Sequence, residues 1–379
     1  MTAGKKIWRT SWRVALCLIL LGWIFQTIFL KEARTSLGEK VWAGYSWSEQ
    51  AQAAWQHGPP KLWSTLATIN PGALALSGLL MGLTILLGIA RWRVVLRVQG
   101  FDLPWGRAAE ISFVAHFFNS FLLGSTGGDL MKAFYAARET HHKKTEAVVT
   151  VFVDRLIGLW AMLLFAGAMM LPNLTLLFLH AKLRSLALLT LAMLGACSGL
   201  VAVAFWGGVS RGWSGARAWL RRLPKGEWLE RSLDSCRQFG HEPFFLSRTL
   251  VISMLLNAIC VFQVWVIGSG LGLNIPPRVL FLIVPVIICI SALPITPSGL
   301  GVRENLFVLM LAESAIGVPD ASALSLSLLA YAGSLFWSLV GGLVYAMLKE
   351  RHHLAEAELE KADPVEPACL DASSVLRPK

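Results

Sequence analysis

Long apolar segments constrain the fold of this chain more than any other feature. A helix crosses roughly 30 Å of hydrocarbon with about 20 apolar residues. Only 15% of the 379 residues are charged, against about 25% in ordinary soluble domains, which excludes a soluble enzyme, a disordered protein and a disulfide scaffold. Six segments are long enough to span: Val14–Leu30, Gly72–Ala90, Leu156–Leu171, Ser185–Ser210, Thr249–Leu271 and Ala321–Leu348.

Lys and Arg residues set the predicted orientation, because they accumulate in cytoplasmic loops. The N-terminus and the stretches Arg91–Arg107, Lys132–Arg155 and Arg211–Arg248 are basic, so we expect them inside. Lys31–Pro71 is poorer in basic residues and rich in Trp, which predicts an outer segment with helices on the membrane surface. The net charge of +11 follows from this topology and does not indicate nucleic-acid binding. Both chain termini are predicted to be cytoplasmic.

Two further apolar stretches are interrupted. Ile111–Gly128 contains His116 and Asn119 and ends in a Gly-Ser-Thr-Gly-Gly sequence, and Val279–Val302 contains three prolines. The segments flanking each stretch lie on one side of the membrane by the charge argument. Each stretch should therefore enter and return as a re-entrant hairpin, from opposite faces. Broken backbone at membrane depth requires a surrounding of protein or a polar cavity.

The two interrupted stretches resemble each other. Gly124 to Gly128, followed by Phe134, aligns with Pro297 to Gly301, followed by Phe307, at a constant offset of 173 residues. Each stretch lies between two full spans, which gives units over about 72–172 and 249–348, linked by 173–248. Two similar units of opposite orientation are typical of inverted-repeat transporters, whose sites form where discontinuous helices meet. The alternative is that any Gly/Ser break between apolar runs would look alike.

The predicted fold is therefore all-α: a polytopic membrane helical bundle with about six spans, two re-entrant hairpins and an inverted repeat. Residues 1–71 would form the first span and an outer amphipathic loop. Residues 72–350 would form the membrane domain. The tail 351–379 begins with helix-forming residues and then contains two prolines, so its end is expected to be disordered.

The second break offers a candidate anion pocket. A helix beginning after Ser298, Gly299 and Gly301 would point unpaired amides into the break, which suits a phosphate. Arg303 in the first turn adds a bidentate phosphate donor, and Glu304 follows it. The alternative is that Arg303 and Glu304 form a structural ion pair.

The first break carries a similar set of groups. Gly127 and Gly128 allow close backbone approach, Asp129 occupies a first helical turn, and Lys132 follows one turn later. Asn119 precedes the break and would either contact the substrate or cap backbone. We predict that these residues belong to the substrate site, with a structural Asp129–Lys132 ion pair as the alternative.

Asp154 and Arg155 stand at the mouth of an apolar span. Ionisable residues within membrane segments are by default functional hypotheses. We predict that Asp154 and Arg155 form gating ion pairs, although residues at a span end can simply anchor it at the headgroups. The sequence shows no catalytic serine elbow, zinc-protease motif or phosphate-binding loop, and its histidines lack metal-ligand spacing. We therefore expect no catalytic residue, metal or cofactor.

Three motifs resemble the transmembrane region of the lysylphosphatidylglycerol synthase family, the flippase-like domain of the multiple peptide resistance factor. They are Gly127-Gly128-Asp129-Leu130-Met131-Lys132-Ala133-Phe134, Asp154-Arg155-Leu156-Ile157-Gly158-Leu159 and Pro294-Ile295-Thr296-Pro297-Ser298-Gly299-Leu300-Gly301-Val302-Arg303-Glu304. The likeness covers roughly residues 70–350. Ser298 stands where the family often has Gly, and Met131-Lys132 where it often has Arg. The aminoacyl-transferase domain of the synthase has no counterpart after Leu348.

The resemblance implies a lipid-translocating membrane domain without the synthase. Stand-alone members of the family are linked to moving polar lipids, polyprenyl-phosphate sugars or hopanoids. The expected function is a flippase or transporter for an anionic or polar lipid in the cytoplasmic membrane. Two alternatives remain: a membrane-embedded transferase or phosphatase acting on a lipid headgroup, and a non-catalytic partner of a lipid-synthesis enzyme. The lipid, the energy source and the oligomeric state are not specified by the sequence.

Overall fold

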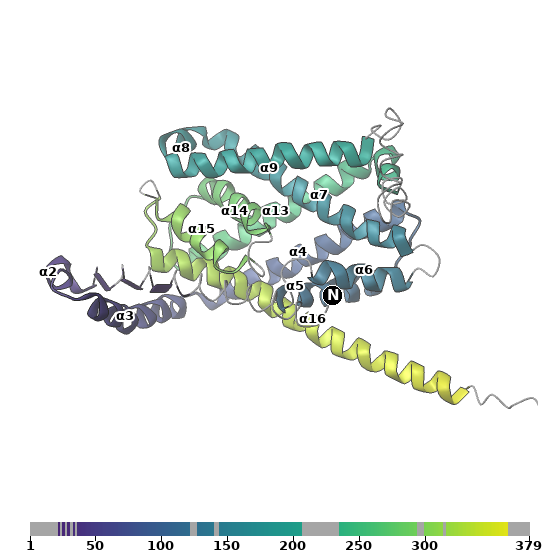
Figure 1. Ribbon diagram of the computed structural model, residues 1–379, viewed down its shortest axis with the longest axis horizontal. Coiled ribbons are helices and arrows are strands. Elements are labelled where there is room, and N and C mark those ends of the chain that lie inside the picture. Colours follow the sequence, from purple (N-terminus) through teal and green to yellow (C-terminus); the bar gives the residue numbers. More distant parts are fainter. Residues whose placement is uncertain are drawn as a thin grey trace, which may run out of the picture.

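The computed structural model is built of helices and their connections (Figure 1). It describes residues 22, 25–26, 29–30, 33–34, 36–121, 127–139, 144–206, 235–293, 299–313 and 316–362. The elements in chain order are α2 (Glu39–Trp42), α3 (Trp47–Ala67), α4 (Pro71–Val98), α5 (Trp105–Phe121), α6 (Gly127–Glu139), α7 (Lys144–Met170), η2 (Leu171–Asn173), α8 (Leu174–Leu179), α9 (Ala181–Trp206), α13 (Phe245–Gly270), α14 (Pro277–Ser291), α15 (Val302–Leu311) and α16 (Asp320–Ala362).

Five helices of the described chain are long and apolar enough to cross a membrane: α4, α7, α9, α13 and α16. They coincide with five of the six predicted spans and confirm the predicted all-α membrane bundle. Most of the remaining predicted span, Val14–Leu30, lies outside the described residues. Several helices continue past the apolar run that predicts them. The length of an apolar run reflects the thickness of the hydrocarbon, and a helix can extend beyond the hydrocarbon on either side.

Helices α4 and α13 pack side by side in opposite directions through the middle of the bundle. At one end, the Asn70 amide donates to the Gly270 carbonyl at 3.0 Å. At the other, the Gln99 side-chain amide donates to the Ser235 carbonyl at 3.0 Å. A Cβ at Gly270 would lie only 2.5 Å from the Cβ of Ala73, so glycine is what allows this approach. Because the two helices are antiparallel, the segment after α4 and the segment after α13 start at opposite ends of the bundle.

The two interrupted stretches form helical hairpins, as predicted. Helices α5 and α6 have 17 and 13 residues, or about 25 and 20 Å at 1.5 Å per residue, shorter than the hydrocarbon. An ion pair of 2.7 Å between Arg107 near the start of α5 and Glu139 at the end of α6 holds the open ends together. Helices α14 and α15 are shorter still, with 15 and 10 residues. The hairpins follow opposite ends of the α4–α13 pair, so they enter the bundle from opposite sides (Figure 1).

The return helix of the first hairpin corrects one sequence prediction. The stretch Lys132–Arg155 was expected to be a cytoplasmic basic loop, but Lys132 lies in the middle of α6 and Arg155 lies in α7. Lys132 is buried. Part of the basic charge of this stretch is therefore paired with acidic residues inside the bundle.

The inverted repeat is visible in both order and packing. Corresponding helices begin at Pro71 and Phe245, Trp105 and Pro277, Gly127 and Val302, and Lys144 and Asp320, which are separations of 174, 172, 175 and 176 positions. Packing repeats in the same way: α5 contacts α16 as α14 contacts α7, and α16 contacts α4 as α7 contacts α13. The entering helix of each hairpin thus packs on the last span of the other unit. The cavity described below lies where α5 and α14 pack on the last spans of the opposite units.

Two elements extend beyond the bundle core. Helix α3 packs on α16 and exposes Trp47, Trp55 and Trp63, the side chains expected of a helix lying on a membrane interface. Helix α16 has 43 residues, and its C-terminal part projects away from the other helices (Figure 1).

Candidate functional site: an arginine-lined cavity between the hairpins

A cavity of about 520 Å³ lies between the two repeat units. Residues of α4, α5, α7, α13, α14, α15 and α16 line it, so both units contribute. The described residues of its wall include three arginines, Arg91, Arg155 and Arg303, and no acidic residue. Ligand pockets typically measure about 300–1,000 Å³. The cavity therefore has the volume of a small-molecule or headgroup site, with a cationic wall.

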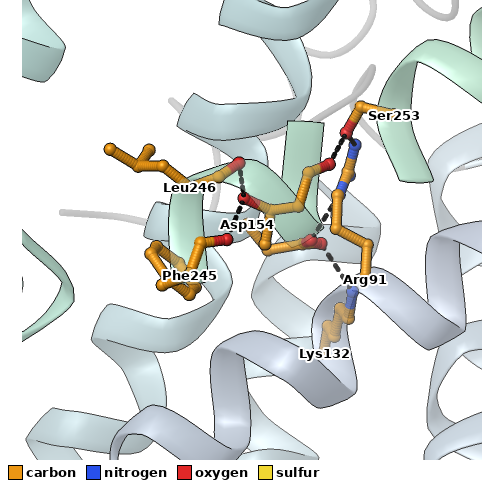
Figure 2. A network of polar contacts seen from close by, with 7 residues as sticks. Arg91, Lys132, Asp154, Phe245, Leu246 and Ser253 are labelled. Carbon is orange, nitrogen blue, oxygen red and sulfur yellow. Dashed lines mark hydrogen bonds and ion pairs between the residues drawn. The ribbon is translucent and has the colours of Figure 1, made fainter. Parts of the chain in front are cut away.

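Asp154 organises the charges behind this wall (Figure 2). Its Oδ1 accepts from Arg91 Nε at 2.8 Å, and its Oδ2 accepts from Lys132 Nζ at 3.1 Å. The three residues come from α7, α4 and α6, and all three side chains are largely buried. One carboxylate is thus the shared counter-ion of two cations. Removing it would leave both without a counter-ion, which is far more costly inside a protein than at its surface.

The network continues from Arg91 into α13, as Figure 2 shows. Arg91 Nη1 donates to Ser253 Oγ at 3.2 Å, and Ser253 Oγ donates to the Thr249 carbonyl at 2.7 Å. Thr249 in turn donates to the Phe245 carbonyl at 2.9 Å. Because α13 belongs to the second unit, Arg91 joins the acidic residue of the first unit to the backbone of the second.

Gly158 explains the spacing of the Asp-Arg-x-x-Gly motif. It lies one helical turn after Asp154, on the same face of α7. A Cβ at Gly158 would be 2.8 Å from both Nη1 and Nη2 of Arg91. The motif therefore combines an acceptor for the guanidinium with the space in which the guanidinium lies.

Lys132 is held behind the cavity rather than in its wall. Its ammonium lies 4.2 Å from the centroid of the Trp92 ring and donates to the Asp154 carboxylate. This placement favours a role in positioning Asp154. Direct contact between Lys132 and a substrate stays a prediction.

Asp129 and Arg155 form a second ion pair, with Arg155 Nε 3.5 Å from Asp129 Oδ2. The contact joins the first turn of α6 to α7. The Arg155 side chain is 49% exposed and lines the cavity. Of the three cavity arginines, it is the one with the loosest internal pairing. The alternative pairing of Asp129 with Lys132 is not the one formed, since Lys132 contacts Asp154.

Asn119 and Gly128 close the tip of the first hairpin. Asn119 Oδ1 accepts from the Gly128 amide at 2.9 Å, which caps the start of α6. A Cβ at Gly128 would lie 1.9 Å from the Ala115 carbonyl oxygen, so only glycine fits; Gly127 beside it is also buried. Asn119 also lines the cavity. Its capping role is thus observed, and a substrate contact stays a prediction.

Glu304 occupies the start of α15, the equivalent position in the second unit. Its carboxylate is fully buried, accepts from the Gly301 amide at 2.6 Å and pairs with Arg303. Gly299 and Gly301 have φ angles of +69° and +84°, a conformation that favours glycine. Ser298 lies outside the described residues. The Gly301 amide therefore has an internal acceptor, and Arg303 is the member of this motif that reaches the cavity.

Arg303 is held on three sides. Its guanidinium lies 4.3 Å from the centroid of the Tyr331 ring, and Nε donates to Ser327 Oγ at 3.4 Å. Glu304 supplies the counter-ion. These contacts fix the direction of the guanidinium before any ligand arrives, which reduces the ordering needed on binding.

Arg91 lines the cavity but was not predicted as a site residue, and the same holds for four other residues of its wall: Ser253, Asn257, Gln263 and Tyr331. Arg91 directly follows a predicted span and was assigned to a cytoplasmic loop, whereas α4 continues for two more turns. The available signal was the glycine one turn after Asp154, which indicates a large group near that carboxylate. Its partner lies 63 residues away and has no local signature.

These features agree with the comparison to known protein families. No curated protein matches the chain in sequence. The family model described as the lysylphosphatidylglycerol synthase TM region matches residues 50–342, which covers both repeat units and the cavity. With its membrane-spanning helices, the chain is a multi-pass membrane protein, and it belongs to the family of the lysylphosphatidylglycerol synthase transmembrane region.

Proposed function

We propose that this protein moves an anionic or polar lipid, of phospholipid, polyprenyl-phosphate or hopanoid type, between the leaflets of the cytoplasmic membrane. The observation that carries the proposal is the cavity between two inverted hairpins, lined by Arg91, Arg155 and Arg303. Discontinuous helices meeting at an inverted-repeat interface are typical of substrate sites in transporters. Family membership supports a lipid-related role.

The geometry supports movement by exchange of ion pairs. The first unit contributes Asp154 and Asp129, and their partners Arg91, Lys132 and Arg155 lie on different helices. A helix can shift relative to its neighbour only if such contacts break and re-form. We propose that the Asp129–Arg155 pair, which is the longer and more exposed, opens when the headgroup arrives.

Orientation follows from the distribution of basic residues. The ends of α4 and α6 carry Arg97 and Arg138, and α13 begins near Arg248. We propose that this end of the bundle faces the cytoplasm together with both termini. The hairpin α5–α6 would then open toward the cytoplasm and α14–α15 toward the opposite side.

The test is reconstitution of the full chain into phospholipid vesicles that contain a trace of fluorescent lipid, with a membrane-impermeant quencher added outside. The lipid panel comprises phosphatidylglycerol, phosphatidylcholine, a polyprenyl phosphate and a hopanoid. Protein-dependent loss of the protected inner fraction is the expected result for at least one of these lipids. Asp154→Asn should slow the movement, because it removes the shared counter-ion of Arg91 and Lys132.

The matched control is Asp102→Asn. Asp102 also pairs with two arginines, Arg93 and Arg97, but at the longer distances of 3.9 and 3.7 Å, and its own side chain is exposed and away from the cavity. The Asp102→Asn variant should move lipid at the wild-type rate. If no lipid in the panel moves faster than in empty vesicles, the transport proposal is wrong. Formation of a modified lipid that is lost in Asp129→Asn would instead favour the enzyme alternative.

A further inference from the structure

We infer that the cavity selects a singly charged phosphate ester, the phosphodiester of a phospholipid headgroup. Arg155 of the first repeat unit and Arg303 of the second hold this phosphate, and the cavity discriminates against aminoacylated headgroups. This inference rests on the proposed lipid transport and specifies its substrate class. It is carried by the charge balance of the cavity and by the state of each arginine.

The charge balance is the first argument. The described ion-pair cluster around the cavity holds four cations, Arg91, Lys132, Arg155 and Arg303, and three carboxylates, Asp129, Asp154 and Glu304. One positive charge is therefore in excess within this cluster. A buried net charge is costly, so a ligand with one negative charge would neutralise the site. A phosphodiester carries that single charge.

The second argument is which arginines can accept the phosphate. Arg91 is committed on two atoms, to Asp154 at 2.8 Å and to Ser253 at 3.2 Å. Arg155 has one long contact of 3.5 Å and a half-exposed side chain. Arg303 lines the same cavity, where Glu304 pairs with it and Tyr331 and Ser327 fix the direction of its guanidinium. A planar guanidinium suits phosphate oxygens through two parallel hydrogen bonds.

The units meet at this ligand. Arg155 lies on α7 of the first unit and Arg303 on α15 of the second. A phosphate bound by both arginines would attract one cation of each unit. Binding would therefore change how the units sit against each other, which transport requires.

An aminoacylated headgroup fits poorly for the same reason. The lysyl ester of phosphatidylglycerol carries two ammonium groups and one phosphate, so its net charge is positive. The described cavity wall offers no carboxylate, and the three acids of the cluster are paired with the cations behind or beside it. Like charges placed together in a weakly screened site repel.

The test is lipid titration of the purified full chain in a nonionic detergent, with thermal unfolding as the readout, because a ligand that binds the folded state raises the unfolding temperature. The probes are dioctanoyl phosphatidylglycerol, its lysyl ester, dioctanoyl phosphatidylcholine and inorganic phosphate. Phosphatidylglycerol should bind about 10-fold or more tightly than the other three. Arg155→Gln and Arg303→Gln should each weaken it about 10- to 100-fold, the range for loss of a charged hydrogen bond.

Two further variants keep the test falsifiable. Arg155→Lys retains the charge and loses the fork, and should weaken binding less than Arg155→Gln. Arg97→Gln removes an exposed arginine outside the cavity and should leave binding unchanged. If Arg303→Gln is unstable without lipid, Arg155→Gln carries the test, since its single long contact contributes little to folding.

Different results overturn different statements. Equal binding of the lysyl ester or phosphatidylcholine, with lipid movement intact in vesicles, refutes the selectivity and leaves transport standing. Equal binding of inorganic phosphate shows a phosphate site without a lipid role. Wild-type affinity in both Arg155→Gln and Arg303→Gln refutes the location. If no lipid binds and none moves in vesicles, the proposed transport itself fails.

Discussion

Replacing Asp154 by Asn gives the most direct test of how this bundle holds its charges. The Asp154 carboxylate accepts from Arg91 at 2.8 Å and from Lys132 at 3.1 Å, and its side chain is only 9% exposed. Asparagine keeps the shape but leaves two buried cations without a counter-ion. Breaking one buried pair typically costs about 3–5 kcal/mol, so we expect the free energy of unfolding to fall by at least about 3 kcal/mol.

The chain provides a matched control for this loss. Asp102 also faces two arginines, at 3.9 and 3.7 Å, but its side chain is 83% exposed. Water already solvates the Asp102 carboxylate, and the less exposed Arg93 keeps its hydrogen bond of 3.0 Å to the Leu103 carbonyl, so Asp102→Asn should cost less than about 1 kcal/mol. The two variants differ in burial and not in the number of partners.

The assay is denaturant titration of the detergent-solubilised chain, followed by tryptophan fluorescence. Trp92, which contacts Lys132, places one of the reporters beside the network. A third variant carries Arg91→Gln, Lys132→Met and Asp154→Asn together and should be more stable than Asp154→Asn alone, because no unpaired charge remains. Equal stability of Asp154→Asn and Asp102→Asn would refute the reasoning, as would a triple variant less stable than the single one.

Three other substitutions test separate contacts. Gly158→Ala should slow lipid movement severalfold with a small loss of stability, because its Cβ would displace the flexible end of Arg91, as vesicle assays would measure. Gly128→Ala should abolish folded protein in size-exclusion chromatography, since its Cβ would lie 1.9 Å from the rigid Ala115 carbonyl. Glu304→Gln should lower the free energy of unfolding by about 3–5 kcal/mol in denaturant titration, because it weakens the helix cap and leaves the largely buried Arg303 without a counter-ion.

Gly88→Ala is the control for both glycine substitutions, because its Cβ would meet nothing within 4 Å in the same bundle. It should behave as wild type. Normal transport in Gly158→Ala would show that the Arg91 position is not needed, and a well-folded Gly128→Ala would show that the hairpin tip is looser than described. Unchanged stability of Glu304→Gln would remove the case for a structural acid at the start of α15.

Five spans and both hairpins could be predicted from the sequence because hydrocarbon thickness and the cost of unpaired backbone groups act on local composition. The start of helix α6 could be predicted, with Asp129 in its first turn and Lys132 one turn later, but the burial of Lys132 could not. Such a residue is buried only when a partner elsewhere neutralises it. The identity of that partner depends on the packing of the helices and cannot be read from the local sequence.

The candidate site was predicted in part. Asp154, Arg155, Asp129, Arg303 and Glu304 do lie in ion pairs around or beside one cavity. Their pairing could not be derived, because Arg91 reaches Asp154 across 63 positions. Nor does the sequence show that Glu304 turns back to the Gly301 amide. Charge type and position in a segment are local properties, whereas the choice of partner depends on packing.

The C-terminal end of helix α16 should move when the hairpins rearrange. It contacts α5 of one hairpin and α15 of the other, and its 43 residues extend to roughly 65 Å at 1.5 Å per residue, about twice the thickness of the hydrocarbon. A rigid rod amplifies rotation. A tilt of about 10° within the bundle would displace a point about 30 Å beyond it by roughly 5 Å. A fluorophore near the end of this helix would therefore convert rearrangements of the hairpins, too small to resolve at the cavity, into a distance measurable on single molecules.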